Sequence, residues 1–592
     1  MQIHPKDRGR LVDAAMGRIP CDLLIHNVKL FNVFTWETYE AEVGIVDGFI
    51  ACVSADPDGE GGRFEIEAHE RYDGWGQFLI PGFIDSHLHI ESSMMTPAHM
   101  AEAVLPMGTT TLITDPHEVA NVGGVEAVAY MLAASEDLPM RFYVLAPSCI
   151  PSAPGLENAG ASFGAAEVER LMAHPRVLGV AELMDYPGVL SNSSRMRAIM
   201  GACEKRGGFM QGHAPFLSGR DLNAYLAAGV RSDHETRTGR EAREKLRLGM
   251  NVDMRESSVS MDVEAIAPAV LNFRSLTNLS LCTDDLEPED ILTTGHVSRV
   301  AASAVRCGMS PEQAVVCGTL NAAREIGITN LGAVAPGFAA DLQIVSELAC
   351  PRPSAVFAEG CLVAEDGRLT LAIEPRSFPQ EKVNTVRLKR PDAEDLRIRA
   401  KGDAARVRVV RYATPKGTTT EFGVERLPVL NGCLNLGGDP DLKFVAVLNR
   451  HGLNTRFVGV VRGFGTQRGA YGATVSHDCH NLVVVYDTPE DALVVIEALI
   501  ECGGGKVAAL NGRVIASLEL PIYGLISRLP AAELARDIAD VKATLRSKLG
   551  LDVPNPLMRI VSLALPVIPK AKFSDLGLVD VLQQKIVPLF VE

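Results

Sequence analysis

Short apolar runs that end in polar residues alternate with helix-like stretches between residues 78 and 285. The runs are FLIPGFIDSHLHI, GTTTLITDPHE, RFYVLAPSC, VLGVAELMD, GGFMQGHAP, GVRSDHE, GMNVDMRESS and LSLCTDD. The stretches between them, such as PAHMAEAVLPM and NAYLAAG, carry small and apolar residues at helical spacing. Eight strand–helix repeats over about 210 residues suit a (β/α)8 barrel, for which roughly 250 residues is typical. We therefore predict an α/β fold with a (β/α)8 TIM-like barrel over residues 78–330.

Shorter β-rich segments flank this repeat on both sides. Residues 1–77 hold an N-terminal segment and part of a small β domain, with a hairpin pattern around Asp47 and Gly48. Residues 331–385 return to short strands, which we expect to rejoin that small β domain. Residues 386–592 begin with a charged linker-like stretch and continue as a C-terminal α/β domain. An amphipathic helix is predicted there near AAELARDIADVKATLRSKLG.

The composition is that of a globular protein with an acidic balance. The chain has 592 residues, 47% of them hydrophobic, and a formal net charge of -16. An acidic surface repels nucleic acid and anionic lipid, so we expect neither as a partner. No run of about 18 apolar residues predicts a membrane span, and the first residues lack a signal-peptide pattern. We expect a cytoplasmic protein whose 12 cysteines, none in a CxxC pair, are reduced and mostly buried.

Metal-ligating side chains stand at the ends of several predicted strands. His87 and His89 are two residues apart, so they face the same way in a strand, and Asp85 is in phase with them. Other runs end in Glu182, His213, His234 and Asp284. Active sites of such barrels lie at the carboxyl ends of the strands. Imidazole and carboxylate groups gathered there would form a site for divalent metal ions.

Further polar residues follow the same strand ends. They are Ser92, Asp115, His117, Arg255 and Glu256, and we count them as candidate substrate-binding residues. Each could equally support the mouth of the barrel without touching a substrate.

A distal cluster, SHDCHN, holds His477 and His480 in an apolar setting. It is either an ordinary turn with satisfied histidines or a loop that caps the mouth of the barrel, its own or that of a dimer partner. On the second reading His477 and His480 also belong to the substrate-binding candidates.

Longer motifs make the chain resemble a known group of enzymes. PGFIDSHLHIE, the later single histidines, the Asp in CTDD and the closing GAVAPGFAADLQIV resemble the amidohydrolase superfamily over about residues 20–370. Within it, HLHIESSMMTP, TDPHEVANV, GVAELMDYPGV, MNVDMRESS and VSHDCHN are similar to the bacterial adenine deaminases over nearly the whole chain. This resemblance implies hydrolysis of adenine to hypoxanthine and ammonia, in purine salvage.

The resemblance also implies a binuclear metal centre. His87, His89 and Asp284 would hold one divalent ion and His213 and His234 a second, with manganese the first choice and iron or zinc the alternatives. Many relatives bridge the two ions with a modified lysine on the fourth strand, whereas this chain has Glu182 there. We expect the Glu182 carboxylate to bridge them. Two cations that share one water lower its pKa enough to supply hydroxide near neutral pH.

Proton transfer requires further residues in this scheme. Asp284 would accept the proton of the water and deliver it to the departing ammonia. Mononuclear deaminases carry a glutamate three residues after the fifth-strand histidine, where this chain has Phe216. The proton for the purine ring must then come from Glu118, His117 or Glu182, and Glu118 is our choice. We therefore take Asp284, Glu118 and Glu182 as the catalytic candidates.

Two other functions remain open from the sequence. Glu182 as a ligand also suits a deacetylase of N-acyl amines from the same superfamily. A barrel that has lost catalysis could instead act as an assembly scaffold, although an intact ligand set argues against it. Barrels of this group commonly pair, so we expect a homodimer or a higher homo-oligomer.

Overall fold

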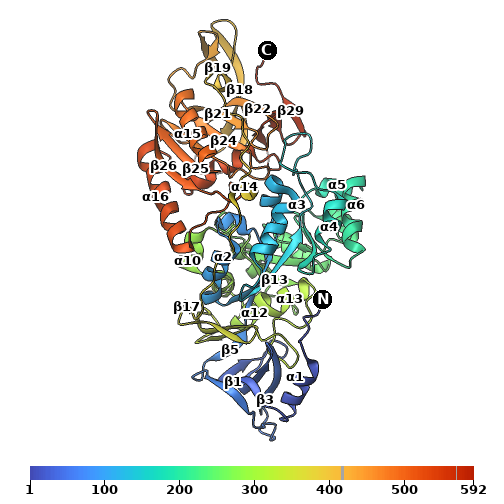
Figure 1. Cartoon of the computed structure of the whole chain (residues 1–592). Helices are drawn as coiled ribbons and strands as arrows, with labels where there is room; N and C mark the ends of the chain where they lie inside the picture. The colour runs from blue at the N-terminus through green and yellow to red at the C-terminus, as the bar shows by residue number, and fades with distance from the viewer. Residues whose placement is uncertain (415–418, 569) are drawn as a thin grey trace.

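The computed structural model describes residues 1–414, 419–568 and 570–592. A small β sheet, a central α/β body and a C-terminal domain follow one another along the long axis of the molecule (Figure 1). The C-terminal domain lies against the side of the central body where α3 (His117–Ala134) and α14 (Gln380–Val383) are seen. Within the described ranges, no helix combines the length and the apolar character that crossing a membrane requires.

The central body contains one parallel strand from each of the eight predicted runs. Five form a sheet in the order β10-β9-β8-β7-β6, and three form a second sheet in the order β11-β12-β13. The strands are β6 (Phe83–Leu88), β7 (Thr109–Thr114), β8 (Arg141–Ala146), β9 (Val177–Leu183), β10 (Phe209–Gly212), β11 (Ser232–Asp233), β12 (Asn251–Arg255) and β13 (Leu279–Cys282). The eight-strand alternation read from the sequence is therefore present.

Two junctions join these sheets edge to edge. At one, a parallel bridge pairs Leu88 with Asp284, and the Asp284 N–H donates to the His87 carbonyl at 3.0 Å. At the other, the Arg231 N–H donates to the Met210 carbonyl at 3.1 Å. Fewer backbone hydrogen bonds join the strands at these two junctions than within the sheets. The strands curl around a common centre in two arcs.

Helices surround the parallel strands, because each crossover must cover the buried outer face of the sheet. They are α2 (Pro97–Val104), α3, α4 (Ala165–Leu171), α5 (Tyr186–Leu190), α6 (Ser194–Glu204), α7 (Gly219–Ala227), α8 (Gly239–Arg247), α9 (Val263–Val270), α10 (Pro288–Thr294), α11 (Val297–Arg306), α12 (Pro311–Val316) and α13 (Ala322–Glu325). The strands carry almost continuous buried runs, as expected for a parallel sheet covered on both faces.

The small β sheet is formed by segments from both sides of the central body, as expected. Its order is β17-β16-β15-β14-β5-β1-β2-β3, with β4 beside β1. The strands are β1 (Cys21–Phe31), β2 (Thr38–Val46), β3 (Phe49–Ala55), β4 (Ala68–Asp73), β5 (Phe78–Pro81), β14 (Leu342–Val345), β15 (Pro353–Ala358), β16 (Cys361–Glu365) and β17 (Arg368–Leu369). The first predicted run is divided here, because β5 pairs with β1 and β14 and only β6 joins the parallel strands.

The C-terminal domain is built on a nine-stranded sheet in the order β20-β19-β18-β22-β21-β24-β23-β25-β26. Its strands are β18 (Ala404–Tyr412), β19 (Thr420–Leu430), β20 (Cys433–Leu434), β21 (Leu442–Leu448), β22 (Arg456–Arg462), β23 (Ala470–Ala473), β24 (Leu482–Tyr486), β25 (Gly505–Leu510) and β26 (Arg513–Glu519). The helices α15 (Pro489–Glu501) and α16 (Ala531–Leu549) pack on it, and α16 is the predicted amphipathic helix. A small sheet of β27 (Ala571–Ser574), β28 (Gly577–Asp580) and β29 (Lys585–Val587) ends the chain.

Candidate metal centre

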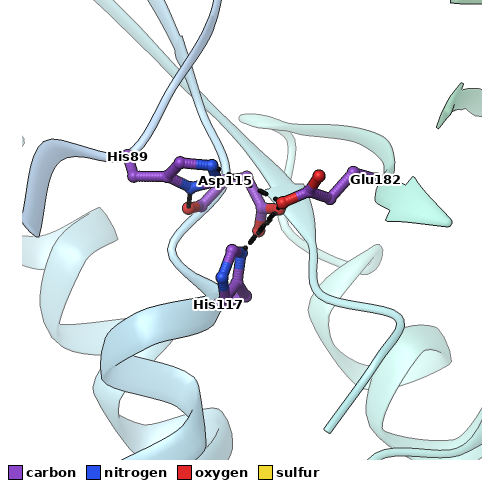
Figure 2. Close-up of side chains that lie close together, drawn as sticks. All are labelled: His89, Asp115, His117 and Glu182. Carbon is purple, nitrogen blue, oxygen red and sulfur yellow. Dashed lines mark hydrogen bonds and ion pairs between the residues drawn. The ribbon is translucent and has the colours of Figure 1, made fainter. Parts of the chain in front are cut away.

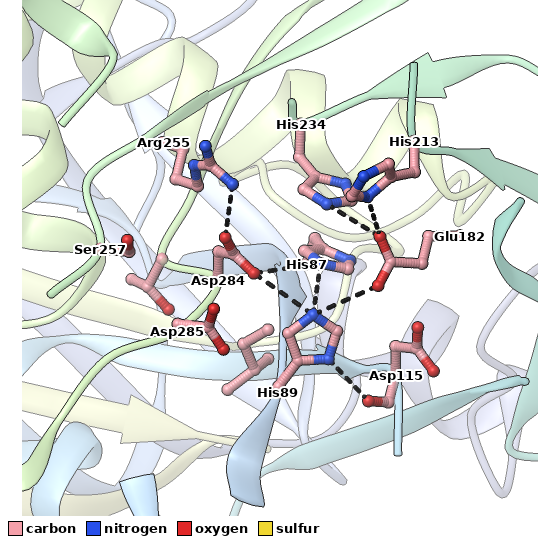
Figure 3. A network of polar contacts seen from close by, with 12 residues as sticks. His87, His89, Asp115, Glu182, His213, His234, Arg255, Ser257, Asp284 and Asp285 are labelled. Carbon is pink, nitrogen blue, oxygen red and sulfur yellow. Dashed lines mark hydrogen bonds and ion pairs between the residues drawn. The ribbon is translucent and has the colours of Figure 1, made fainter. Parts of the chain in front are cut away.

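The carboxyl ends of the parallel strands bring six predicted ligands into one buried cluster. His87 and Glu182 are the next-to-last residues of β6 and β9, and the others follow within two residues of the ends of their strands. The six are His87, His89, Glu182, His213, His234 and Asp284, and Figure 3 shows them around a common centre. Apart from the half-buried His213, all are buried. This is the end of the strands at which the sequence predicted the site.

One half of the cluster joins the two ends of the first and eighth strands. The Nε2 atoms of His87 and His89 are 3.2 Å apart. Asp284 Oδ1 lies 3.6 Å from His87 Nε2 and 3.3 Å from His89 Nε2. These three donor atoms therefore face one small space.

The other half of the cluster is gathered around the Glu182 carboxylate. Its Oε2 lies 2.5 Å from His213 Nδ1 and 3.2 Å from His234 Nε2. Its Oε1 lies 3.5 Å from His89 Nε2. Glu182 thus touches both halves with different oxygens, which is the placement that a bridging carboxylate needs.

The ring nitrogens of His87 and His89 that face away from the centre have partners of their own. His87 Nδ1 lies 2.7 Å from Gln211 Oε1, and His89 Nδ1 lies 3.0 Å from the Asp115 carbonyl oxygen. Because both partners only accept, each Nδ1 carries the proton and each Nε2 is left with its lone pair toward the centre. Gln211 was not among the predicted residues, although it stands two residues before His213 and so faces the same way in a strand.

Burial and charge act against each other in this cluster. Burial alone would raise the pKa of Glu182, but His213 and His234 hold it well below its usual value. Burial would lower the pKa of His213, and Glu182 raises it to about 9. Burial would raise the pKa of Asp284, and Arg255 together with His87 and His89 lowers it well below the usual range. The carboxylates are ionised at neutral pH, where they can accept protons or bind cations.

These donors fit divalent cations. Imidazole nitrogens and carboxylate oxygens are the ligands of zinc, iron and manganese in proteins. The triads His87–His234–Asp284 and Glu182–His213–His234 each place one donor atom per residue within 4.8 Å of the others. The ring stacking of His87 on His234, at 3.7 Å between centroids, brings the two triads together. The cluster has the chemistry and the spacing of a site for divalent cations.

Arg255 holds the far oxygen of Asp284. Its Nη1 donates to Asp284 Oδ2 at 2.6 Å, and the guanidinium also pairs with Glu235 and with Asp262. The buried guanidinium of Arg255 therefore fixes the orientation of the Asp284 carboxylate. The sequence placed Arg255 at this end but as a substrate contact, and it did not identify Glu235 or Asp262.

A second group of side chains adjoins the cluster at the second strand. His117 Nδ1 lies 3.0 Å from Asp115 Oδ2 and 3.4 Å from Glu182 Oε1 (Figure 2). His117 Nε2 lies 3.5 Å from Glu118 Oε1. Asp115 Oδ1 is buried and has no hydrogen-bond partner among the described residues. TDPHE therefore lines one side of the centre.

The distal SHDCHN cluster, for which the sequence left a turn or a cap open, reaches Glu118. His477 Nδ1 lies 3.3 Å from Glu118 Oε1, and His480 Nε2 contacts Glu118 Oε2. Both histidines lie in the loop between β23 and β24. The C-terminal domain of the same chain thus contributes side chains next to the carboxyl ends of the parallel strands.

Three of the residues singled out in the sequence lie outside the cluster. Ser92 donates through Oγ to Asp285 Oδ1 at 2.5 Å, at the edge of the site. Glu256 accepts from Ser303 at 3.1 Å and faces α11. Phe216 is 70% exposed. The structure does not bring the side chains of Glu256 and Phe216 to the candidate centre.

Comparisons with known proteins cover both large parts of the chain. The model of the amidohydrolase family matches residues 78–363, and that of the adenine deaminase C-terminal domain matches residues 417–585.

Similar full-length proteins carry one name. Adenine deaminase 2 of Carboxydothermus hydrogenoformans is 39% identical, covering 98% of this chain and 99% of its own length. Adenine deaminase of Kosmotoga olearia is 37% identical with 98% of both chains covered, and that of Methanothrix thermoacetophila is 40% identical with 98% and 99% covered. The predicted resemblance is confirmed, and the chain belongs to the adenine deaminase family within the amidohydrolases.

Proposed function

We propose that the chain hydrolyses adenine to hypoxanthine and ammonia at a binuclear metal centre. The observation that carries this proposal is the Glu182 carboxylate, whose two oxygens face two separate sets of imidazoles. Family membership supports adenine as the substrate, because the full-length relatives are named adenine deaminases. In the reaction, water replaces the exocyclic amine at C6 of the purine, and the amine leaves as ammonia.

The six clustered residues would hold two divalent ions. His87, His89 and Asp284 would bind one, His213 and His234 the other, and Glu182 both. When bound, the ions would lower the pKa of a water that they share, so that hydroxide is available near neutral pH. Manganese is our first choice, with iron or zinc as alternatives, since all three ions bind nitrogen and oxygen ligands.

Asp284 is proposed to move the proton of the attacking water. Its Oδ1 faces the histidine pair, whereas Oδ2 is held by Arg255. An ionised carboxylate fixed by one oxygen can accept a proton with the other and later pass it to the departing amine. Because Arg255 holds Oδ2, Oδ1 is the oxygen proposed to accept the proton.

The purine ring needs polar partners at the side of the centre lined by TDPHE. We propose that Glu118 contacts the purine ring and is the group that transfers a proton to it. Asp115 and His117 are proposed to contact or orient the substrate. Asp115 offers a buried oxygen without a partner among the described residues. Ser92, Arg255, Glu256, His477 and His480 stay predictions as substrate contacts, although Glu256 faces α11 and Arg255, His477 and His480 are engaged with carboxylates of the protein itself.

The remaining parts of the scheme follow the family and the topology. We propose that the five- and three-stranded sheets act as one (β/α)8 barrel over residues 78–330, with a small β domain from 1–77 and 331–385 and a C-terminal domain from 386–592. A cytoplasmic homodimer or larger homo-oligomer that serves purine salvage, without nucleic acid or membrane partners, is proposed as well.

Ammonia release from adenine by metal-replete protein tests this function. We expect hypoxanthine and ammonia in equal amounts after manganese loading, and no release from N-acyl amines assayed in parallel. If acylated amines were cleaved and adenine left untouched, the substrate assignment would be wrong and the deacetylase alternative right. Loss of all turnover with no bound metal would instead favour a scaffold.

A further inference from the structure

The loop that joins β23 to β24 extends from the C-terminal domain to the mouth of the parallel strands. It spans residues 474–481 and presents His477 and His480 to Glu118. We propose that His480 is a positioning residue for deamination, which fixes the Glu118 carboxylate as an acceptor for an N–H group of the purine. This inference rests on the function proposed above and deepens it, because it makes the C-terminal domain a part of the active site.

The hydrogen bonds of His480 determine which of its nitrogens carries the proton. The Ser476 backbone N–H donates to His480 Nδ1 at 3.1 Å. A backbone N–H can only donate, so Nδ1 must be the unprotonated nitrogen. In the neutral ring the proton is then on Nε2, and Nε2 faces Glu118 Oε2. His480 is therefore arranged as a hydrogen-bond donor to the carboxylate.

Hydrogen bonds also fix the backbone of His480. Arg450 Nε donates to the His480 carbonyl at 2.5 Å, and the His480 N–H donates to the Ser476 carbonyl at 2.8 Å. His480 and Arg450 are both almost fully buried. A side chain with its backbone and both ring nitrogens engaged has little freedom to turn, which suits a role in positioning.

The loop is docked firmly on the central body. Asn481 Nδ2 donates to the Asn158 carbonyl at 3.0 Å, and Asn158 Nδ2 donates to Asp575 Oδ2 at 2.7 Å. Farther along the interface, the Ser527 N–H donates to the Met94 carbonyl at 2.8 Å. These contacts join the C-terminal domain to loops that follow the strands, so the position of His480 is fixed relative to the centre.

Glu118 keeps acceptor capacity for a ligand in this arrangement. Its Oε1 is contacted by His117 and His477, and its Oε2 by His480. An ionised carboxylate can accept about four hydrogen bonds, so three imidazole contacts leave about one acceptor position. Because acceptor-only groups bind donors, that position fits an N–H of the purine and not a ring nitrogen lone pair. This would make ionised Glu118 a substrate acceptor in the resting enzyme.

The charges around Glu118 come from three elements. His117 faces it from α3, Glu91 from η1 (Ile90–Ser93), and His477, Asp478 and His480 from the loop. Burial would raise the pKa of Glu118, and the three histidines lower it well below its usual value. Glu91 and Asp478 act in the opposite direction, because a second negative charge disfavours ionisation. Loss of the His480 donor would therefore raise the pKa of Glu118.

The test compares His480→Leu with His480→Gln in the metal-loaded, full-length enzyme. Leucine removes the donor, whereas the glutamine amide can place an N–H close to where Nε2 stood. Hydrogen bonds to charged groups are stronger than those between neutral groups, so we expect kcat/KM for adenine to fall about tenfold or more in H480L. The loss should lie mainly in KM, the acidic limb of the pH profile should move to higher pH, and H480Q should recover most of the activity.

Metal content and a matched histidine control separate positioning from general damage. We expect H480L to hold as much manganese as the wild type and to bind hypoxanthine more weakly by calorimetry. His174→Leu removes an imidazole from the turn before β9 and should change none of these properties. Equal losses in H480L and H480Q at every pH, or an H480L profile like that of the wild type, would overturn the positioning role.

Failure of the proposed function gives a different result. A wild-type enzyme that binds two metal equivalents and leaves adenine untouched overturns the function and this inference with it. A wild-type enzyme that deaminates adenine, next to an unresponsive H480L, overturns the inference alone.

Discussion

Arg255 Nη1 donates to Asp284 Oδ2 at 2.6 Å, so that the other oxygen of Asp284 faces the His87–His89 pair. The same guanidinium pairs with Glu235 and Asp262 and is 1% exposed. Its planar fork of five donors can meet three carboxylates at once. The carboxylate proposed to move the proton is thus oriented by a cation that contacts no predicted metal ligand other than Asp284.

Arg255→Lys is expected to lower both metal affinity and turnover. A lysine has one point charge and cannot keep the three carboxylate contacts of the guanidinium, so Asp284 loses its fixed orientation. Changes to the partner of a metal ligand typically cost 10–100-fold, and we expect a loss of about that size in kcat/KM. Steady-state assays together with metal titration measure it. Arg243→Lys, on the exposed face of α8, is the matched control, and equal activities of the two variants would contradict the role of Arg255.

Glu182→Gln is expected to separate the two halves of the metal cluster. The amide keeps the size of the side chain but carries no charge, and its nitrogen cannot ligate a cation. We expect metal occupancy to fall below that of the wild type and turnover to fall by orders of magnitude. Elemental analysis and ammonia release measure the two effects. Glu264→Gln, exposed on α9, should retain both, and near-wild-type turnover in E182Q would remove Glu182 from the mechanism.

The placement of the six clustered residues could be predicted because it depends on strand geometry alone. His87 and His89 are related by the two-residue period of a strand, and Glu182, His213, His234 and Asp284 stand at the ends of the parallel strands β9, β10, β11 and β13. Parallel strands bring their carboxyl ends to one face, so no knowledge of loop structure was required. The same period argues against pairing Arg255 with Glu256, since neighbouring residues of a strand face opposite sides, and Glu256 indeed faces α11.

The contacts made by loops could not be predicted in this way. Glu235 and Asp262 reach Arg255 from turns whose shape is not encoded by periodicity. His480 lies 362 residues after Glu118 in the chain, and only the docking of the C-terminal domain brings them together. The sequence offered a cap over the barrel mouth as one reading of the SHDCHN cluster, but it held no information on which residue the histidines would contact.

Metal affinity is expected to rise with pH toward the pKa of His213. Without metal, Glu182 raises the pKa of His213 to about 9, despite burial. The metal-free site is therefore protonated at His213 below about pH 9, and a cation must displace that proton to bind. Calorimetric titration of chelator-treated protein with manganese, in buffers of different ionisation enthalpy, should show proton release at pH 7 that diminishes toward pH 9. Binding without proton release at pH 7 would contradict this protonation state.

Lys572 is expected to make the stability of the C-terminal domain depend on pH. Its side chain is buried, and its ammonium donates to the Ser562 carbonyl at 2.7 Å. Burial lowers its pKa to about 7 from the usual 10.5. Between these values the unfolded chain binds a proton that the folded domain does not, so the free energy of unfolding should rise with pH across this window. The slope from this group is at most about 1.4 kcal/mol per pH unit.

Lys572→Met removes the buried ionisable group and should raise the melting temperature most near neutral pH, where the wild type bears the largest penalty. Denaturant unfolding from pH 7 to 10 measures the slope, and exposed Lys585→Met is the control. If K572M kept the wild-type slope, the buried ammonium would not be its source.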